Sequence, residues 1–198
     1  MGDNPAVNEW ERYTATYPDR ESVSGPGSTL DFTTGLREWL PTLFTQYDIR
    51  SVLDAPCGDF HWLSHVDLTG IDYLGWDVQP ALIERNKTAH PGKTFDCVNL
   101  LTKRIIPTVD LILCRDLFAH LPDKHVSSVL AKFTKSGSRY LLATNFDVEN
   151  TSDNPYDSDG FYYRPVNLCA PPFNMPTPLH TLDEPGPEPG RHMALWEL

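Results

Sequence analysis

Short apolar runs alternate with amphipathic segments along the middle of the chain. Five strand-like runs predict strands at residues 51–55, 73–78, 94–98, 109–114 and 139–145. The spacing of apolar positions between them predicts short helices at residues 60–66, 80–89 and 122–135. Strands that alternate with helices favour right-handed crossovers, so the pattern predicts an α/β fold with a doubly wound, mainly parallel sheet covered on both faces.

Apolar positions at both ends of this region add further elements. An apolar stripe before the first strand predicts a helix that begins near Thr29, with Ser28 as its N-cap and a kink or break at Pro41. At the other end, residues 192–198 have a strand pattern, and we expect them to pair with residues 178–182.

The composition changes after residue 146. Nine of the 18 prolines lie between Pro155 and Pro189, which excludes a helix there. The same stretch contains the aromatic run 161–163, so we expect an ordered loop that acts as a lid or substrate wall. Residues 1–27 are polar and broken by prolines, and they are predicted to be an N-terminal extension.

Charge narrows the classes of function. The chain has 16 Lys+Arg and 27 Asp+Glu, a formal net charge of −11, whereas nucleic acids and anionic membranes bind cationic surfaces. No apolar run approaches the roughly 20 residues that cross a bilayer, and the N-terminus has no signal-peptide pattern. We therefore expect a cytoplasmic protein that binds neither nucleic acid nor membrane. The cysteines lack the paired spacing of a zinc site and are predicted to be buried, reduced thiols: Cys57, Cys97, Cys114 and Cys169.

A candidate ligand site lies where the first two strands end. Gly58 follows the first strand and allows a tight turn with close backbone approach to a ligand. Asp77 ends the second strand 19 residues later, where a carboxylate can accept both hydroxyls of a ribose. The several glycines of a pyrophosphate-binding fingerprint are missing, so a ligand with ribose and adenine but no phosphate fits best.

These motifs resemble those of a known enzyme family. Residues 51–63, SVLDAPCGDFHWL, resemble motif I of the class I S-adenosylmethionine (SAM)-dependent methyltransferases, and residues 73–78 resemble their second-strand acidic motif. The likeness continues at residues 25–29, 96–99, 110–116 and 164–173. The whole pattern, over about residues 24–198, is similar to a compact bacterial subfamily associated with sugar and polysaccharide methylation.

The resemblance implies a Rossmann-like domain over residues 28–198, with an antiparallel C-terminal strand and residues 147–191 as the acceptor-side loop and final strands. It also implies SAM as the cofactor. The implied cofactor-binding residues are Asp54, Ala55, Gly58, Asp77, Val78, Asn99, Leu100 and Arg115. Among them, Asp54 would line the methionine part, Asp77 would bind the ribose, and Val78 would lie against the adenine.

Methyl transfer to a hydroxyl requires a positioned acceptor and a base. Asp116 and His120 follow the fourth strand, and either one can serve as that base. The acceptor side is predicted to include Asn145, Tyr162, Tyr163 and Arg164, because aromatic rings stack on sugars and polar groups bond hydroxyls.

The predicted function is SAM-dependent O-methylation of a small sugar or oligosaccharide hydroxyl, with a homodimer as one allowed assembly. The alternatives are methylation of another small metabolite at oxygen or nitrogen, and a non-catalytic module that binds the cofactor. No metal site is predicted. The acids Asp153, Asp157 and Asp159 resemble part of a calcium loop but lack its terminal glutamate, and no clear motif supports magnesium.

Overall fold

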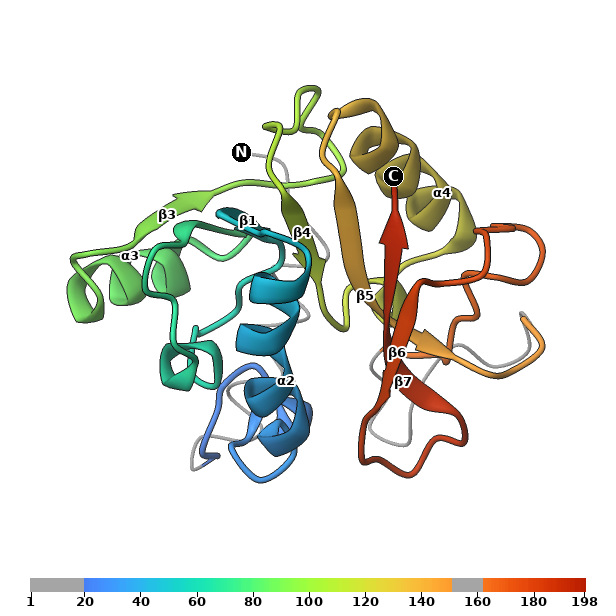
Figure 1. Cartoon of the computed structure of the whole chain (residues 1–198), viewed down its shortest axis with the longest axis horizontal. Coiled ribbons are helices and arrows are strands. Elements are labelled where there is room, and N and C mark those ends of the chain that lie inside the picture. The colour runs from blue at the N-terminus through green and yellow to red at the C-terminus, as the bar shows by residue number, and fades with distance from the viewer. Residues whose placement is uncertain (1–19, 151–161) are drawn as a thin grey trace.

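A seven-stranded sheet runs through the part of the chain that the computed structural model describes, residues 20–150 and 162–198 (Figure 1). Its order is β3-β2-β1-β4-β5-β7-β6. The strands are β1 Ser51–Asp54, β2 Asp72–Asp77, β3 Thr94–Cys97, β4 Leu111–Cys114, β5 Tyr140–Phe146, β6 His180–Asp183 and β7 Arg191–Glu197. The first five pair in parallel and β6 and β7 are antiparallel, which confirms the predicted fold class.

Within the described residues, three α-helices and three short 3-10 helices accompany these strands. They are α2 Thr34–Gln46, α3 Pro80–Ala89, α4 Asp123–Lys135, η1 Pro26–Ser28, η2 Leu63–His65 and η3 Phe118–His120. Helices α3 and α4 begin and end within a residue of their predicted limits.

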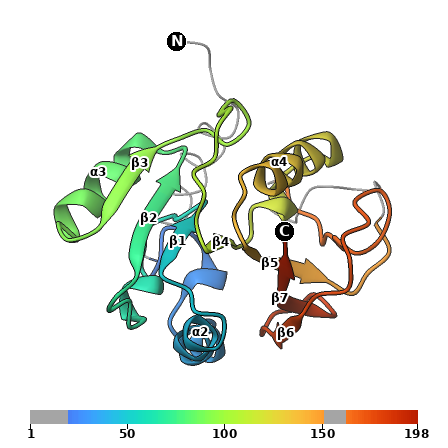
Figure 2. The same cartoon turned by 45° about the horizontal axis from the view of Figure 1, so that its top comes forward.

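The two faces of the sheet carry separate hydrophobic cores. Neighbouring residues of one strand point to opposite faces, so Val52 joins the core under α2 whereas Leu53 joins the core under α4. Figure 2 shows α2 and α4 on opposite sides of the sheet. With both faces covered, the carboxyl ends of the parallel strands are where a ligand is expected to bind.

The helix predicted at residues 60–66 is wrong. The chain there forms turns and the single 3-10 turn η2. Gly58 and Phe60 have φ angles of 53° and 55°, which an α-helix does not contain. Phe60, Trp62 and Leu63 are all buried, so this segment contributes apolar side chains to the core from a looped backbone.

Helix α2 begins later than predicted. Its N-cap is Thr33, whereas Ser28 ends η1 and Thr29 is extended, so the helix cannot start near Thr29. Pro41 lies inside α2 without dividing it. Four buried side chains form the face that packs on the sheet: Leu36, Leu40, Leu43 and Phe44.

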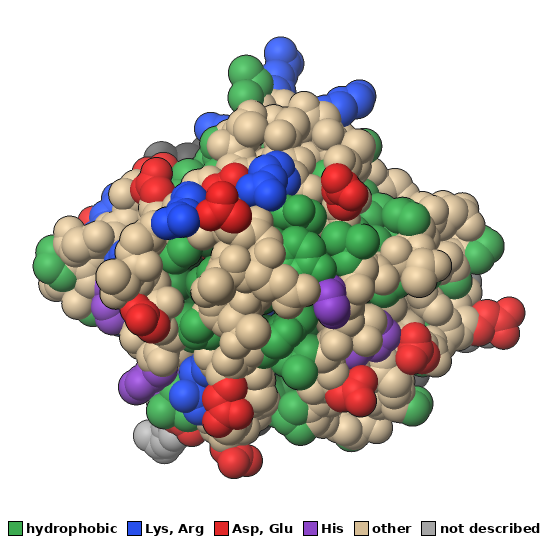
Figure 3. Space-filling view, viewed as in Figure 1, with side chains coloured by type: hydrophobic (Ala, Val, Ile, Leu, Met, Phe, Trp, Pro, Cys, Tyr) green, Lys and Arg blue, Asp and Glu red, His purple; other side chains and the backbone are tan. Residues whose placement is uncertain are grey.

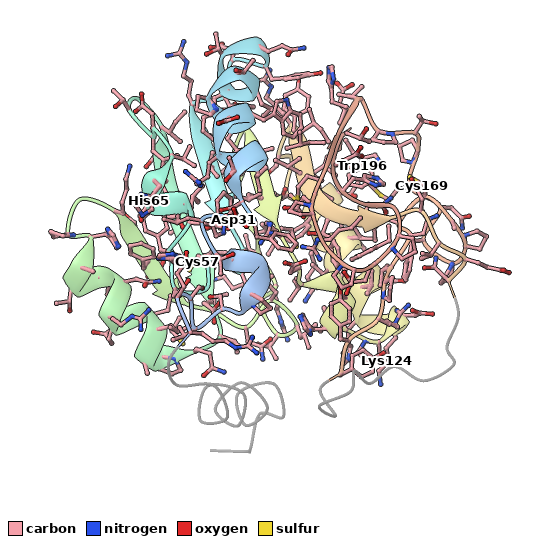
Figure 4. All side chains as sticks on the ribbon, turned by 90° about the horizontal axis from the view of Figure 1, so that it is seen from below. Asp31, Cys57, His65, Lys124, Cys169 and Trp196 are labelled. Atoms are coloured by element: carbon pink, nitrogen blue, oxygen red, sulfur yellow. The ribbon has the colours of Figure 1, made fainter. Side chains whose placement is uncertain are left out.

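The C-terminal hairpin pairs as predicted, with His180 opposite Leu195. Because β7 lies between β5 and β6, its residues Met193–Trp196 are completely buried. Trp196 Nε1 donates a hydrogen bond of 2.8 Å to the Pro176 carbonyl, which the Cys169 thiol also contacts at 3.5 Å. Trp196 and Cys169 lie on the same side of the molecule in Figure 4. These bonds fix the segment before β6 against the sheet.

The burial of the cysteines agrees only in part with the prediction. All four cysteines are free, and Cys57 and Cys114 are buried as predicted, whereas Cys97, at the end of the edge strand β3, is exposed and Cys169 is half-buried. Lysine and arginine side chains lie scattered among acidic ones on the face in Figure 3. None of the described helices has the length and apolar character needed to cross a membrane.

Candidate functional site

The turn after β1 is tied to the end of β2. The Gly58 amide donates to Asp77 Oδ2 at 3.0 Å, and the Gly58 carbonyl accepts a bond of 2.8 Å from the Asn86 side chain on α3. The Cys57 amide donates to the Trp76 carbonyl at 2.8 Å. The first two strands therefore end in one connected structure.

Asp77 lies buried at the centre of this structure. Its Oδ1 accepts the Gln79 amide at 2.9 Å, while its Oδ2 accepts Gly58. Burial raises the pKa of Asp77, and the backbone hydrogen bonds oppose that rise. A carboxylate oxygen has two lone pairs, so each oxygen can still accept a hydroxyl of a ribose.

Asp54 at the end of β1 is also buried. It accepts a hydrogen bond of 2.8 Å from the Tyr73 hydroxyl. Burial raises the pKa of Asp54 to about 8, and the nearby charge of Asp77 adds to the rise. A cationic ligand beside Asp54 would favour its ionised form.

We expect Asp54 to make the fold less stable as the pH rises. Because the folded pKa of about 8 exceeds the ordinary value of 3.8, the stabilisation is complete below about pH 4 and is lost between there and about pH 8. In Asp54→Asn, the melting temperature should fall less across this range than in the wild type. Asp72→Asn, exposed at the start of β2, is the control. Equal falls in the wild type and Asp54→Asn would contradict the buried-acid account.

Gly58 is required by both conformation and space. An added Cβ would lie 2.3 Å from Ser24 Oγ, and the φ of +53° is rarely adopted by other residues. Gly58→Ala should lower the free energy of unfolding by about 1–3 kcal/mol, measured by urea denaturation. Gly92→Ala is the matched control, because an added Cβ there meets nothing within 4 Å. Equal stability of the two variants would contradict the geometry.

Residues 22–28, here called the strap, cross the turn after β1. The Ser22 hydroxyl and the Val23 amide donate to Asp59 Oδ2 at 2.8 and 2.9 Å, and the Ser24 hydroxyl donates to Asp59 Oδ1 at 3.1 Å. Figure 4 shows Asp31, three residues after the strap, and Cys57, in the turn after β1, near the middle of the view from below. Asp59 was not among the residues predicted from the sequence, although an acid directly after Gly58 was a signal that could have indicated it.

Four charged side chains meet at the carboxyl end of β4. We call Arg115, Asp116, Glu184 and Arg191 the charge cluster. Arg115 Nε donates to Glu184 Oε1 at 2.8 Å, and Arg191 donates to both oxygens of Asp116 at 2.7 and 2.9 Å. Arg115 also donates to the Gly27 carbonyl of the strap at 2.7 Å. The guanidinium of Arg115, one of the residues predicted to bind the cofactor, thus bonds groups of the protein in this structure.

Asp116 is held in an unusual conformation with little capacity to accept a proton. Its φ is 61°, and its amide donates to Thr144 Oγ1 at 3.0 Å. Burial by itself raises the pKa of Asp116, but the charges of Arg115 and Arg191 outweigh it, so the pKa lies below the ordinary value. The two arginines therefore make Asp116 a weaker base than an ordinary aspartate.

His120 ends η3 and is exposed. Its Nδ1 lies 2.8 Å from the Tyr162 carbonyl, which can only accept, so Nδ1 carries the hydrogen and Nε2 is the acceptor of the neutral ring. The rings of His120 and Tyr163 lie 5.4 Å apart. A ring held in this tautomer is suited to take a proton at Nε2.

The predicted acceptor-side residues separate into two groups. Tyr162 and Tyr163 lie beside His120. Burial raises the pKa of Tyr163, and the charge of Glu188 adds to the rise, so this hydroxyl stays protonated. Asn145 and Arg164 have structural contacts instead: Asn145 is 2% exposed and bonds His192 and the Leu168 amide, while Arg164 pairs with Asp123 and the Leu121 carbonyl.

The expected adenine side lies at the ends of β2 and β3. Val78 and Asn99 follow these paired strands, and the Val98 amide donates to the Asp77 carbonyl at 2.8 Å. Asn99 Oδ1 accepts the Leu101 amide at 2.9 Å, so this oxygen already has one partner. Leu100 and Ala55 are buried, and both belong to the core under α4.

Acidic and histidine side chains do not gather into a metal site within the described residues. Asp153, Asp157 and Asp159 lie outside them. Glu184 and Arg191 were not predicted either, because they have no local signal: their partners Arg115 and Asp116 lie 69 and 75 residues away in the sequence.

Comparison with known proteins relates the chain to solved structures through its fold. No protein-family model matches the sequence, and no curated protein matches it. The N-methyltransferase NodS from Bradyrhizobium japonicum WM9, solved with S-adenosylhomocysteine (SAH), has a TM-score of 0.69 at 11% identity, covering 98% of each chain. A 1,6-didemethyltoxoflavin-N1-methyltransferase from Burkholderia thailandensis, solved with SAH, has a TM-score of 0.65 at 15% identity, covering 100% of this chain and 92% of that one.

A third similar structure is magnesium protoporphyrin IX methyltransferase from Synechocystis PCC 6803 with bound SAM. Its TM-score is 0.60 at 12% identity, over 98% of this chain and 91% of that one. Because all three identities are low, the likeness concerns the fold. This chain has the fold of the SAM-dependent methyltransferases.

Proposed function

We propose that this protein is a SAM-dependent O-methyltransferase that acts on a hydroxyl of a small sugar or oligosaccharide. The observation that carries the proposal is the Asp77 carboxylate, fixed by the Gly58 and Gln79 amides at the joined ends of β1 and β2. The three similar structures were solved with SAM or SAH, which supports the same cofactor here.

In this proposal, four residues hold the cofactor. Asp77 accepts the ribose hydroxyls, and Asp54 lies on the methionine side, where positive charge favours its ionised form. Val78 and Asn99 lie on the adenine side. The bound cofactor supplies an electrophilic methyl group on a sulfonium sulfur.

The acceptor side is formed by His120 and its neighbours. His120 Nε2 takes the proton of the acceptor hydroxyl, because Nδ1 is held by the Tyr162 carbonyl. Tyr163 offers an aromatic face to a sugar, and its hydroxyl, which donates to Glu188, can still accept a bond from a sugar hydroxyl. This polar lining favours a hydroxylated acceptor over an apolar one.

A cytoplasmic location belongs to the same proposal. All four cysteines are free, which suits a reducing compartment.

A panel of acceptors tests the proposal. The purified chain is incubated with SAM and with neutral mono- and oligosaccharides or small amines, and SAH and methylated products are measured by mass spectrometry. We expect SAH and an O-methylated sugar, and neither with His120→Ala. An N-methylated product would instead support methylation of a small metabolite at nitrogen, the activity for which two of the similar proteins are named. SAH binding without any product would support a non-catalytic module.

A further inference from the structure

Tyr73 extends to the end of β1 through a gap on one face of the sheet. In the parallel register of β1 and β2, Asp54 lies beside Gly75, and Tyr73 lies two residues earlier in β2. Residues two apart in a strand share a face, so a side chain at residue 75 would occupy the space between Tyr73 and Asp54. A Cβ added at Gly75 would lie 2.8 Å from the Tyr73 hydroxyl oxygen and 2.7 Å from Phe95 Cδ1. The glycine therefore leaves the space that the phenol occupies.

Aromatic neighbours hold the Tyr73 ring in this gap. Its centroid lies 4.9 Å from that of Phe60, in the turn after β1, and 5.7 Å from that of Phe95 on β3. Tyr73 is buried, and its hydroxyl donates the 2.8 Å hydrogen bond to Asp54 Oδ2. The described residues give Asp54 Oδ1 no hydrogen bond, so this second oxygen is left for a ligand.

Packing alone does not require this arrangement. A phenylalanine at residue 73 would fill the same aromatic space without burying a hydroxyl, and a glycine inside a strand weakens it. What Tyr73 and Gly75 achieve together is local. They fix one oxygen of the Asp54 carboxyl at the end of β1 and leave the other unbonded.

We propose that Tyr73 is a positioning residue for the amino-acid end of the cofactor, holding the Asp54 carboxylate for the ligand's ammonium group through the space that Gly75 leaves. This inference rests on the proposed function, because it takes Asp54 to lie on the methionine side. SAH carries an ammonium group at that end, and a hydrogen bond between ammonium and carboxylate is among the strong ones. The analogue 5′-methylthioadenosine (MTA) has the same adenine and ribose but no amino-acid end. Removing the Tyr73 hydroxyl should therefore weaken the binding of SAH and not that of MTA.

The groups around Asp54 set the expected pH effect. The ionisable side chains that face it come from β2, from the turn after β1 and from the end of β4: Tyr73, Asp77, Cys57, Cys114 and Arg115. Burial raises the pKa values of the phenol and of both thiols, so these three stay neutral at pH 6 to 8. The charges of Asp77 and Arg115 act on Asp54 in opposite directions.

Burial raises the pKa of Asp54 to about 8, so below that pH the carboxyl must lose a proton before it pairs with an ammonium group. The affinity for SAH should therefore rise about tenfold from pH 6 to pH 8 relative to the affinity for MTA. Any titration of Asp77 at the ribose acts on both ligands and cancels in this ratio.

Tyr73→Phe tests the inference by the ratio of two dissociation constants, measured by calorimetry at pH 7.5. SAH should bind about tenfold more weakly than to the wild type, and MTA should bind within about twofold of it. Gly75→Ala, whose methyl group displaces the phenol, should change the ratio in the same direction. Tyr47→Phe is the matched control, because it removes a hydroxyl beside Tyr140 at the opposite end of the sheet and should keep both constants.

Thermal melts identify the variants that fold. Wild-type affinity for SAH in folded Tyr73→Phe, or equal weakening of SAH and MTA, would overturn the inference. If Tyr73→Phe does not fold, Gly75→Ala decides by the same ratio. If neither folds, the wild type decides, and a ratio that stays constant from pH 6 to pH 8 would overturn the inference. A wild-type chain that binds MTA and SAH at no concentration would instead refute the proposed cofactor, and this inference with it.

Discussion

Replacing His120 by alanine is expected to lower kcat about 1,000-fold while the dissociation constant for SAH stays within about twofold. The ring is exposed, and the Tyr162 carbonyl holds it with Nε2 as acceptor. An alcohol without a base is a weak nucleophile, so the loss should fall on turnover. Steady-state SAH release with the acceptor from the panel measures kcat, and calorimetry measures SAH binding.

His125→Ala is the matched control. This histidine lies on α4, five residues after His120, and no described contact joins its side chain to Asp116 or Tyr163. It should keep wild-type turnover. If His120→Ala keeps full turnover and Asp116→Asn loses it, then Asp116 takes the proton of the acceptor. Asp116 would in that case be the base despite its lowered pKa.

The second large effect is expected at Asp77. Asp77→Ala should weaken SAH binding about 100-fold, since two charge-assisted hydrogen bonds to ribose hydroxyls are lost. Asp72→Ala is the control at the opposite, exposed end of β2 and should bind SAH as the wild type does. Calorimetric titration gives both constants. Because Asp77 also bonds Gly58, a thermal melt must show that Asp77→Ala is folded. Equal affinities in the folded variants would refute the ribose contact.

The sheet could be predicted from the sequence because its strands carry their own signal. The β1 and β2 segments are apolar runs of the right length, and each ends at an acid that stays buried, Asp54 and Asp77. The loop at residues 60–66 could not be predicted, because its apolar spacing suits a helix. Only the left-handed backbone of Phe60, set by its place in the core, excludes one.

The residues of the candidate site that have a local sequence signal could be predicted, and those brought together by the fold could not. Gly58, Asp77 and His120 follow strands or turns visible in the sequence. Arg191 reaches Asp116 across 75 residues, and only because β7 inserts beside β5. Asn145 has a residue type typical of a binding surface, yet β7 covers it, so its amide bonds His192 instead of a ligand.

Titration of SAH into the wild-type chain by calorimetry tests the central claim most directly, with NAD and ATP as comparison ligands. The account predicts one SAH bound per chain and much weaker binding of both phosphate-bearing nucleotides, since the turn at Gly58 offers a single glycine. No heat of SAH binding at millimolar ligand, or tighter binding of NAD, would contradict it.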